Sequence, residues 1–129
     1  MSRSTGRFRR SDRLLLPRDF QRVARQGTRI ASGDFVVLVA PARRVAGARG
    51  DIRRLGVTAS RKVGPAIQRN RLKRGIREWF RHSRGKFEEN VDIVVIARPG
   101  AGELDRKQLR AQLAELLSKL ERRRGSADG

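Results

Sequence analysis

The sequence predicts a single-domain α+β sandwich, in which helices pack on one β-sheet. Its 129 residues are enough for one compact domain with short tails. Three segments have apolar residues at helical spacing, and three shorter runs of apolar, β-branched residues have the length of strands. They follow one another as helix, strand, strand, helix, strand, helix, so both kinds of element are expected to share one core.

The N-terminal region is predicted to hold a basic arm followed by a short helix. Residues 1–13 alternate Arg with small polar residues, a composition that buries too little apolar surface to fold, so we expect a flexible arm. Pro17 suits the first position of a helix and Gly27 suits the end of one. This pair predicts a helix over residues 17–26.

Three strands are predicted from apolar and β-branched runs. Residues 35–39 and 55–59 are two of these three strands, and residues 91–97 are the third. Residues 28–31 are a candidate for a fourth strand. The segment 41–54 is rich in Gly, Ala and Arg without a period, so we interpret it as an exposed connection. Residues 91–97 are an unbroken apolar run, which is typical of a strand buried on both faces. The order of the strands in the sheet does not follow from these patterns.

The second helix is predicted to begin at Pro65 and to have two distinct sides. Projection at about 100° per residue separates apolar from basic positions. The apolar side gathers Leu72, Ile76, Trp79, Phe80 and Ser83. The opposite side gathers Asn70, Arg71, Arg74, Arg77 and Arg81. One side is therefore predicted to pack, and the other to form a cationic ridge.

The third helix is predicted over residues 105–122. Asp105 and Gln108 have the spacing of a capping box, in which two side chains satisfy backbone N–H groups at the start of a helix. A leucine stripe follows at Leu109, Leu113, Leu116, Leu117 and Leu120. Residues 14–122 are therefore predicted to form the domain, and residues 123–129 a frayed tail.

The charge of the chain points to a polyanionic partner. Lys and Arg total 32 against 13 Asp and Glu, which gives a formal net charge of +19 at pH 7 and a sequence pI of about 12.0. The longest apolar runs are far shorter than the roughly 20 residues of a membrane helix. No signal-peptide core follows the basic N-terminus, so we expect a cytoplasmic protein that does not engage a membrane.

Residue types that the sequence lacks exclude several chemistries. The chain has no Cys and one His, His82, which excludes disulfides, zinc–thiolate clusters, thiol catalysis and sites built from several histidines. His82 lies beside Arg81 and Arg84 and is expected on the surface. The carboxylates, Asp92 among them, are not paired for acid–base or two-metal chemistry. We therefore expect no catalytic residue and no metal site in this chain.

Four cations in six residues begin the second helix, in the stretch Arg69-Asn70-Arg71-Leu72-Lys73-Arg74, called here the basic hexad. Guanidinium groups bind phosphate through paired hydrogen bonds, and Lys adds a point charge. The alternative is a solvated helix face without a ligand, but an amphipathic helix in so basic a chain favours a phosphate backbone. Arg69 projects near the apolar side, where it serves either packing or the start of the helix.

Two Phe residues are candidates for stacking on an unpaired base. Phe20, on the first helix, could form such a platform beside cations, or could be plain core packing, which its spacing favours. Phe35 opens a strand, and its spacing alone also favours the core. Trp79 and Phe80 lie on the packing side of the second helix and are predicted to be core.

Two motifs follow each other in the sequence at a characteristic spacing: Arg61-Lys62-Val63-Gly64 and then the basic hexad. Together they make residues 60–81 resemble the protein subunit of bacterial ribonuclease P. Further similarity extends from residue 14 to about 120, at Asp19-Phe20, Gly27-Thr28, Phe35-Val36 and the run Asp92-Ile93-Val94-Val95-Ile96-Ala97-Arg98. The resemblance implies a ribosomal-protein-like sandwich with one mostly antiparallel sheet, about three helices and a left-handed βαβ crossover. Because about 98% of such crossovers are right-handed, residue patterns alone do not predict that hand.

The resemblance also implies a function and its site residues. Such a protein binds a large catalytic RNA, and the two remove the 5′ leader of precursor tRNA by endonucleolytic cleavage; the RNA and its magnesium ions perform the chemistry. The residues expected at the catalytic RNA are Arg69, Asn70, Arg71, Lys73, Arg74 and Arg77. Those expected at the single-stranded leader are Phe20, Phe35, Arg61 and Lys62. Ala24 and Leu38 stand where the family often has aromatics, so leader stacking is expected to be weaker or to rely more on Arg. No DNA partner is expected.

Two other classes of protein share part of this pattern. A structural ribosomal protein is equally small, basic and free of Cys, and would bind folded RNA without turnover, but the spacing of the basic hexad argues against it. An autonomous nuclease would require carboxylates or histidines that this chain does not bring together in sequence. Reconstitution with a ribonuclease P RNA at low magnesium separates the first alternative from the function implied above.

Overall fold

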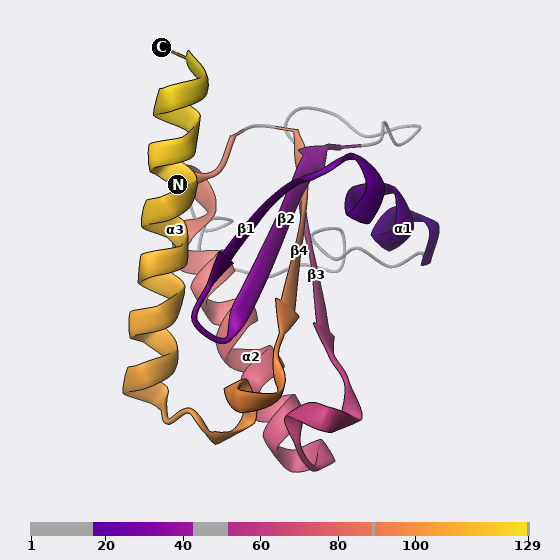
Figure 1. Cartoon of the computed structure of the whole chain (residues 1–129), viewed down its shortest axis with the longest axis vertical. Helices are drawn as coiled ribbons and strands as arrows, with labels where there is room; N and C mark the ends of the chain where they lie inside the picture. Colours follow the sequence, from indigo (N-terminus) through magenta and orange to yellow (C-terminus); the bar gives the residue numbers. More distant parts are fainter. Residues whose placement is uncertain (1–16, 43–51, 89, 129) are drawn as a thin grey trace, which may run out of the picture.

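A computed structural model describes residues 17–42, 52–88 and 90–128 of the chain. One four-stranded sheet forms the centre of this part, with helices against both of its faces (Figure 1). The helices and strands are, in chain order, α1 Pro17–Gln26, β1 Thr28–Ser32, β2 Phe35–Pro41, β3 Arg53–Ala59, α2 Ala66–Ser83, β4 Val91–Ala97 and α3 Arg106–Asp128. Short 3-10 helices lie between them at η3 Arg61–Val63, η4 Arg84–Lys86 and η5 Pro99–Glu103.

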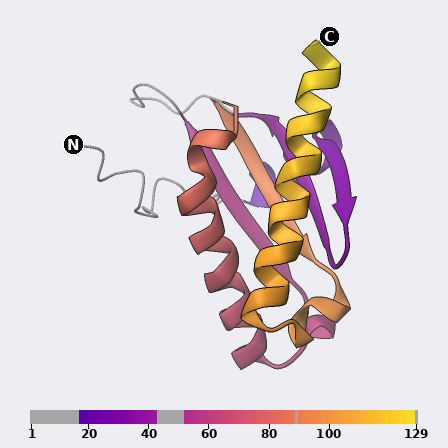
Figure 2. The ribbon, with the colours of Figure 1, turned by 90° about the vertical axis from the view of Figure 1, so that its left-hand side faces the viewer.

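The strand order in the sheet is β1-β2-β4-β3. The pairs β1–β2 and β2–β4 are antiparallel, whereas β3 and β4 are parallel and are joined through α2. In Figure 1 both parallel strands run downward, and the chain moves from β3 on the right to β4 on its left. Helix α2 lies behind the sheet, as the side view in Figure 2 also shows, so this βαβ crossover is left-handed. The mostly antiparallel α+β sandwich with a left-handed crossover is therefore confirmed.

Side chains that alternate along the strands enter two separate cores. The larger core lies between the sheet and the pair α2 and α3, and its buried strand residues include Ile30, Phe35, Val37, Leu55, Ile93 and Val95. The smaller core lies on the opposite face, under α1, where Val23 packs on Leu38, Ala40 and Val94. The sheet therefore separates α1 from α2 and α3, and a residue's position along a strand decides which helices it meets.

The predicted two-sided character of α2 is confirmed. Leu72, Ile76 and Phe80 are buried in the larger core, and Trp79 is half-buried at its margin. The absence of a side chain at Gly75 lets α3 approach closely, because an added Cβ there would lie 2.6 Å from Cδ2 of Leu109. The side of α2 that faces away from the sheet is left to the basic residues.

The structure extends several predicted elements. The candidate fourth strand exists as β1, and β3 begins at Arg53 rather than at residue 55, because its pairing with β4 continues to Val91. Helix α3 continues to Asp128, so the tail predicted at 123–129 is helical as far as that residue. Glu and Arg at positions 121–124 are good helix formers, which explains the continuation. The predicted arm, residues 1–13, lies outside the described residues.

Candidate nucleic-acid interface

The basic hexad extends from the end of the first turn of α2 into the third turn. Asn70, Arg71 and Arg74 are exposed there, whereas Arg69 and Lys73 are half-buried. Since the buried residues of the helix are all apolar, the cations are not needed to hold α2 on the sheet. Arg77, one turn further on, is half-buried and continues the row of positive charge.

Arg69 has a local structural role at the start of α2. Its Nε donates a hydrogen bond to the carbonyl oxygen of Gly64, at 3.2 Å. Gly64 has a φ of 151°, a value that side-chain-bearing residues rarely adopt, and it turns the chain from η3 towards the helix. Of the two roles considered for Arg69, packing or the start of the helix, the structure places it at the start of the helix.

Arg71 reaches from α2 to the segment that precedes α3. Its Nη2 donates a hydrogen bond to the carbonyl oxygen of Gly102 in η5, at 3.3 Å. Arg61 and Lys62 are exposed in η3, directly after β3 and ahead of α2. Along the chain, these two cations lie between the end of β3 and the start of α2.

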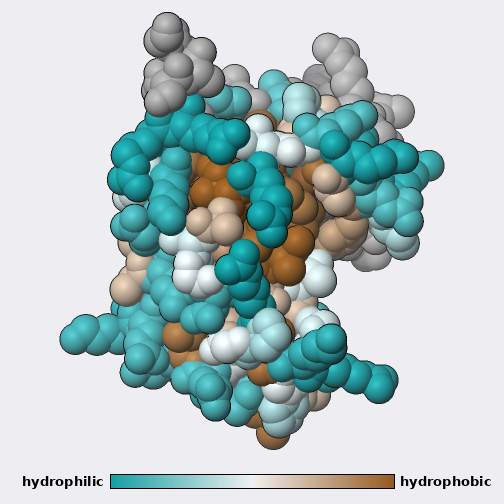
Figure 3. All heavy atoms as spheres, in the orientation of Figure 1, coloured by the Kyte–Doolittle hydropathy of each residue, from teal (hydrophilic) through white to brown (hydrophobic). Residues whose placement is uncertain are grey.

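The opposite face of the sheet carries Phe20. Its ring is half-buried against the smaller core and packs with Val23, Leu38 and Val94. Figure 3, which views this face, shows hydrophobic side chains gathered in its middle with hydrophilic ones around them, and an outline that is hollowed below α1. Ala24 is exposed on α1, and Leu38 is buried. Phe20 is thus the aromatic side chain that α1 presents at this surface.

Phe35 requires a correction. Its side chain is 0% exposed and belongs to the larger core under α2 and α3, on the other face of the sheet from Phe20. Phe35 and Leu38 are three positions apart on the same strand, so the two side chains point to opposite faces. A base stacked beside Phe20 cannot reach Phe35, and the expectation that Phe35 contacts the leader is wrong.

Four charged side chains join α1 to the sheet, and the sequence reading missed this group. Asp92 is completely buried, and it accepts hydrogen bonds from Arg54 of β3 and from Arg22 of α1. Asp19 of α1 lies 3.6 Å from Nη2 of Arg54 and 3.7 Å from Nη2 of Arg22. The hydrogen bond to Asp92 raises the pKa of Arg54 above its ordinary value, against the opposing effect of burial. A charged residue inside an otherwise apolar strand was the available signal.

Among the described residues, neither a cluster of metal ligands nor a helix able to span a membrane is present. In this part of the chain, no three His, Asp or Glu side chains come together in a way that could hold a metal ion. Within the same residues, every helix is too short or too polar to cross a bilayer. His82 is exposed beside Arg81, as predicted.

Together, a sheet flanked by helices, a basic exposed α2 and a half-buried aromatic on the opposite face define a small RNA-binding α+β protein. The family model described as Ribonuclease P matches residues 8–121. The chain belongs to the ribonuclease P protein family. Members of this family are subunits of a ribonucleoprotein endoribonuclease, and the family's known role is processing of the 5′ end of tRNA.

Individual relatives show the same similarity over nearly the whole chain. The "Ribonuclease P protein component" of Thermotoga maritima is 39% identical over 121 residues, which cover 91% of this chain and 98% of the relative. That of Pseudomonas aeruginosa is 42% identical over 118 residues, covering 91% and 83%. Among solved structures, the Staphylococcus aureus RNase P protein has a TM-score of 0.76 at 32% identity, covering 87% of this chain and 97% of that chain. The Thermotoga maritima RNase P protein has a TM-score of 0.68 at 37% identity, covering 83% and 96%.

Proposed function

We propose that this chain binds the catalytic RNA of ribonuclease P through α2 and the 5′ leader of precursor tRNA through the α1 face. The observation that carries this division is the placement of the basic hexad and of Phe20 on opposite faces of one sheet. A protein of this size could then contact both RNAs at once without competition between them.

The contact with the catalytic RNA rests on the positive charge along the side of α2 that faces away from the sheet. The proposed residues are Arg69, Asn70, Arg71, Lys73, Arg74 and Arg77. Glu78, the acidic residue of α2, lies 3.8 Å from Arg81 rather than within the hexad. Phosphates supply the counter-charge that the hexad lacks, and their release of counterions makes such binding strongly dependent on salt.

The contact with the leader rests on one aromatic ring and two cations. Phe20 exposes part of its ring to an unpaired base, while Arg61 and Lys62 lie exposed beyond the end of β3. A single strand that runs from α1 along β3 would place its phosphates near these two cations. Ala24 and Leu38 add no second aromatic ring. Binding of the leader therefore depends both on stacking at Phe20 and on the charges of Arg61 and Lys62.

The phosphodiester chemistry is assigned to the RNA and to magnesium ions held by the RNA and the substrate. The described residues of this chain bring no three carboxylate or imidazole groups together, which supports placing the ions outside the protein. Its contribution is then to bring the leader and the catalytic RNA together and to neutralise phosphate charge, both of which reduce the magnesium that the RNA needs.

Reconstitution tests this proposal. The full chain is added to a bacterial ribonuclease P RNA and a precursor tRNA at a magnesium concentration too low for the RNA alone. We expect leader removal to appear with the chain, and the chain without RNA to cleave nothing. A structural RNA-binding protein of the ribosomal type would leave the magnesium requirement unchanged. Cleavage by the chain alone, abolished by a point mutation in it, would contradict the assignment of the chemistry to the RNA.

A further inference from the structure

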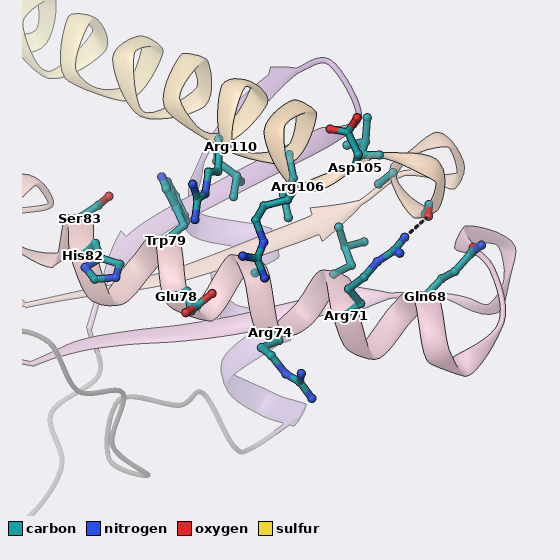
Figure 4. Close-up of a pocket in the computed structure, with 17 residues that line it drawn as sticks. Gln68, Arg71, Arg74, Glu78, Trp79, His82, Ser83, Asp105, Arg106 and Arg110 are labelled. Atoms are coloured by element: carbon teal, nitrogen blue, oxygen red, sulfur yellow. Dashed lines mark hydrogen bonds between the residues drawn. The ribbon is translucent and has the colours of Figure 1, made fainter.

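A groove of about 500 Å³ runs between α2 and the start of α3, on the side of the molecule opposite α1. Helix α2 forms one wall, α3 forms the other, and η5 closes one end. Figure 4 shows Arg106 and Arg110 reaching from α3 towards α2, whereas Arg74 of α2 points away from α3. The volume is in the range that holds a nucleotide-sized ligand.

The rim of the groove has an excess of unpaired positive charge. Within the described part of the chain, Arg74, Arg106 and Arg110 have no hydrogen bond or ion pair, and all three are exposed. Both carboxylates at the rim have partners: Asp105 accepts a hydrogen bond from the backbone N–H of Gln108 at 2.7 Å, and Glu78 lies near Arg81. Two of these cations, Arg106 and Arg110, reach into one narrow space, which favours an anionic occupant.

The floor of the groove is apolar. Leu72, Leu109 and Leu113 line it together with Trp79. The indole ring of Trp79 packs edge-on against Phe87, with ring centroids 5.6 Å apart. Its Nε1 is buried and has no hydrogen-bond acceptor in the structure.

We infer that this groove binds an unpaired nucleotide of the catalytic RNA, with its base against the apolar floor and its phosphates at Arg106 and Arg110. A nucleotide combines the required features, which are a flat apolar face and negative charge. The inference rests on the proposed function, and extends the RNA contact from α2 onto α3. The catalytic RNA is favoured over the leader because Arg71 and Arg74 belong both to the groove and to the basic hexad, whereas Phe20 lies on the other face.

The groove has a built-in reporter, because Trp79 is the single Trp of the chain. The full chain is titrated with a ribonuclease P RNA alone, while Trp79 emission and the dissociation constant are measured over a series of salt concentrations. The groove variant is Arg106→Ala with Arg110→Ala. The control variant is Lys107→Ala with Arg123→Ala, which removes the same charge from exposed positions of α3 outside the groove.

We expect Trp79 emission to change saturably with the RNA. The groove variant should bind about tenfold or more weakly than the control variant, and the slope of log affinity against log salt should fall by roughly one per lost phosphate contact. Equal affinities for the two variants would overturn the inference. The inference would also be overturned if Trp79 emission did not change with the catalytic RNA. The same holds if the emission changed only with precursor tRNA or with the concentration of the protein.

If the unmodified chain fails to bind the RNA at all, the proposed function itself fails. If the unmodified chain binds the RNA and promotes cleavage, but the groove variant and the control variant bind equally well, only the inference about the groove is overturned.

Discussion

Arg54 and Asp92 form a buried two-point ion pair: Nε of Arg54 donates to Oδ1 of Asp92 and Nη2 donates to Oδ2, both at 2.7 Å. The two residues lie opposite each other in the parallel pair β3–β4. Arg22 of α1 also donates to Asp92, and Asp19 of α1 lies near Arg54. The position of α1, and of Phe20 with it, is thus fixed to the sheet by buried charge as well as by the smaller core.

Replacing Asp92 with Asn is expected to destabilise the fold by about 3–5 kcal/mol, because Arg54 then stays buried without its counter-charge. The measurement is the free energy of unfolding in urea. Glu103→Gln is the matched control, since the same chemical change at an exposed position is expected to alter stability by less than about 0.5 kcal/mol. Equal effects of the two changes would show that the ion pair contributes nothing to stability.

The sign of the pH dependence follows from the raised pKa of Arg54. A cation whose pKa is higher in the folded state stabilises the fold in full at every pH below its unfolded pKa, and loses that effect as the pH rises through its folded pKa. The stabilisation by charged Arg54 is therefore present in full through the neutral and mildly alkaline range. Arg54→Met should remove it equally at both ends of that range.

Arg71→Ala with Arg74→Ala is expected to leave the fold intact and to weaken binding to the catalytic RNA. Both side chains are exposed, so each change should cost less than about 0.5 kcal/mol of stability. Each lost phosphate contact should lower the salt slope of binding by roughly one. The readouts are thermal melting and a filter-binding titration in several salt concentrations. Unchanged affinity and slope, in a protein that melts normally, would remove the hexad from the RNA interface.

Two glycines offer a paired test of the contact between η3 and η5, which holds the carbonyl that Arg71 binds. An added Cβ at Gly102 would lie 2.1 Å from the backbone carbonyl oxygen of Val63, whereas one at Gly85 would meet nothing within 4 Å. Gly102→Ala is therefore expected to cost at least about 1–3 kcal/mol of stability, since backbone must move. Gly85→Ala should be nearly neutral. Thermal melting compares them, and similar melting temperatures would contradict this account of the contact.

The helices were well predicted from local sequence patterns, because helix formation depends on residues that are close together in the sequence. The capping box is one case: the backbone N–H of Asp105 donates to Oε1 of Gln108 at 2.9 Å, and that of Gln108 donates to Oδ1 of Asp105 at 2.7 Å. The buried Leu72 and Ile76 on one side of α2 are another. Both depend on spacings of three or four residues, which are visible in any sequence.

Features that depend on the sheet were not predictable in the same way. Arg54 and Asp92 lie 38 residues apart, and only the order of the strands brings them together. The groove between α2 and α3 depends on how two helices pack, and Arg106 and Arg110 have no distinguishing pattern of their own. Phe35 is different, because its three-residue distance from Leu38 already places the two on opposite faces of any strand. The resemblance to a family with aromatic residues in its cleft nevertheless led to the prediction that Phe35 contacts the leader.

Phe20→Ala is expected to weaken binding of precursor tRNA that carries a leader, and to spare mature tRNA and the catalytic RNA. Loss of one stacked base is worth about 1–3 kcal/mol of binding. Because the ring is half-buried, stability should also fall, but by less than the roughly 3–5 kcal/mol of a fully buried Phe. The measurements are thermal melting and the dissociation constants of the reconstituted enzyme for the two tRNA substrates.

Val23→Ala separates a role in stacking from a role in the core at this site. Val23 is 0% exposed in the same small core and offers nothing to a leader, so its truncation should lower the melting temperature without selective loss of leader binding. If Phe20 acts through the leader, its truncation increases the ratio of the two tRNA dissociation constants, and truncation of Val23 does not. Equal weakening of both substrates by Phe20→Ala, together with a large drop in melting temperature, would assign the ring to the core and remove it from the leader surface.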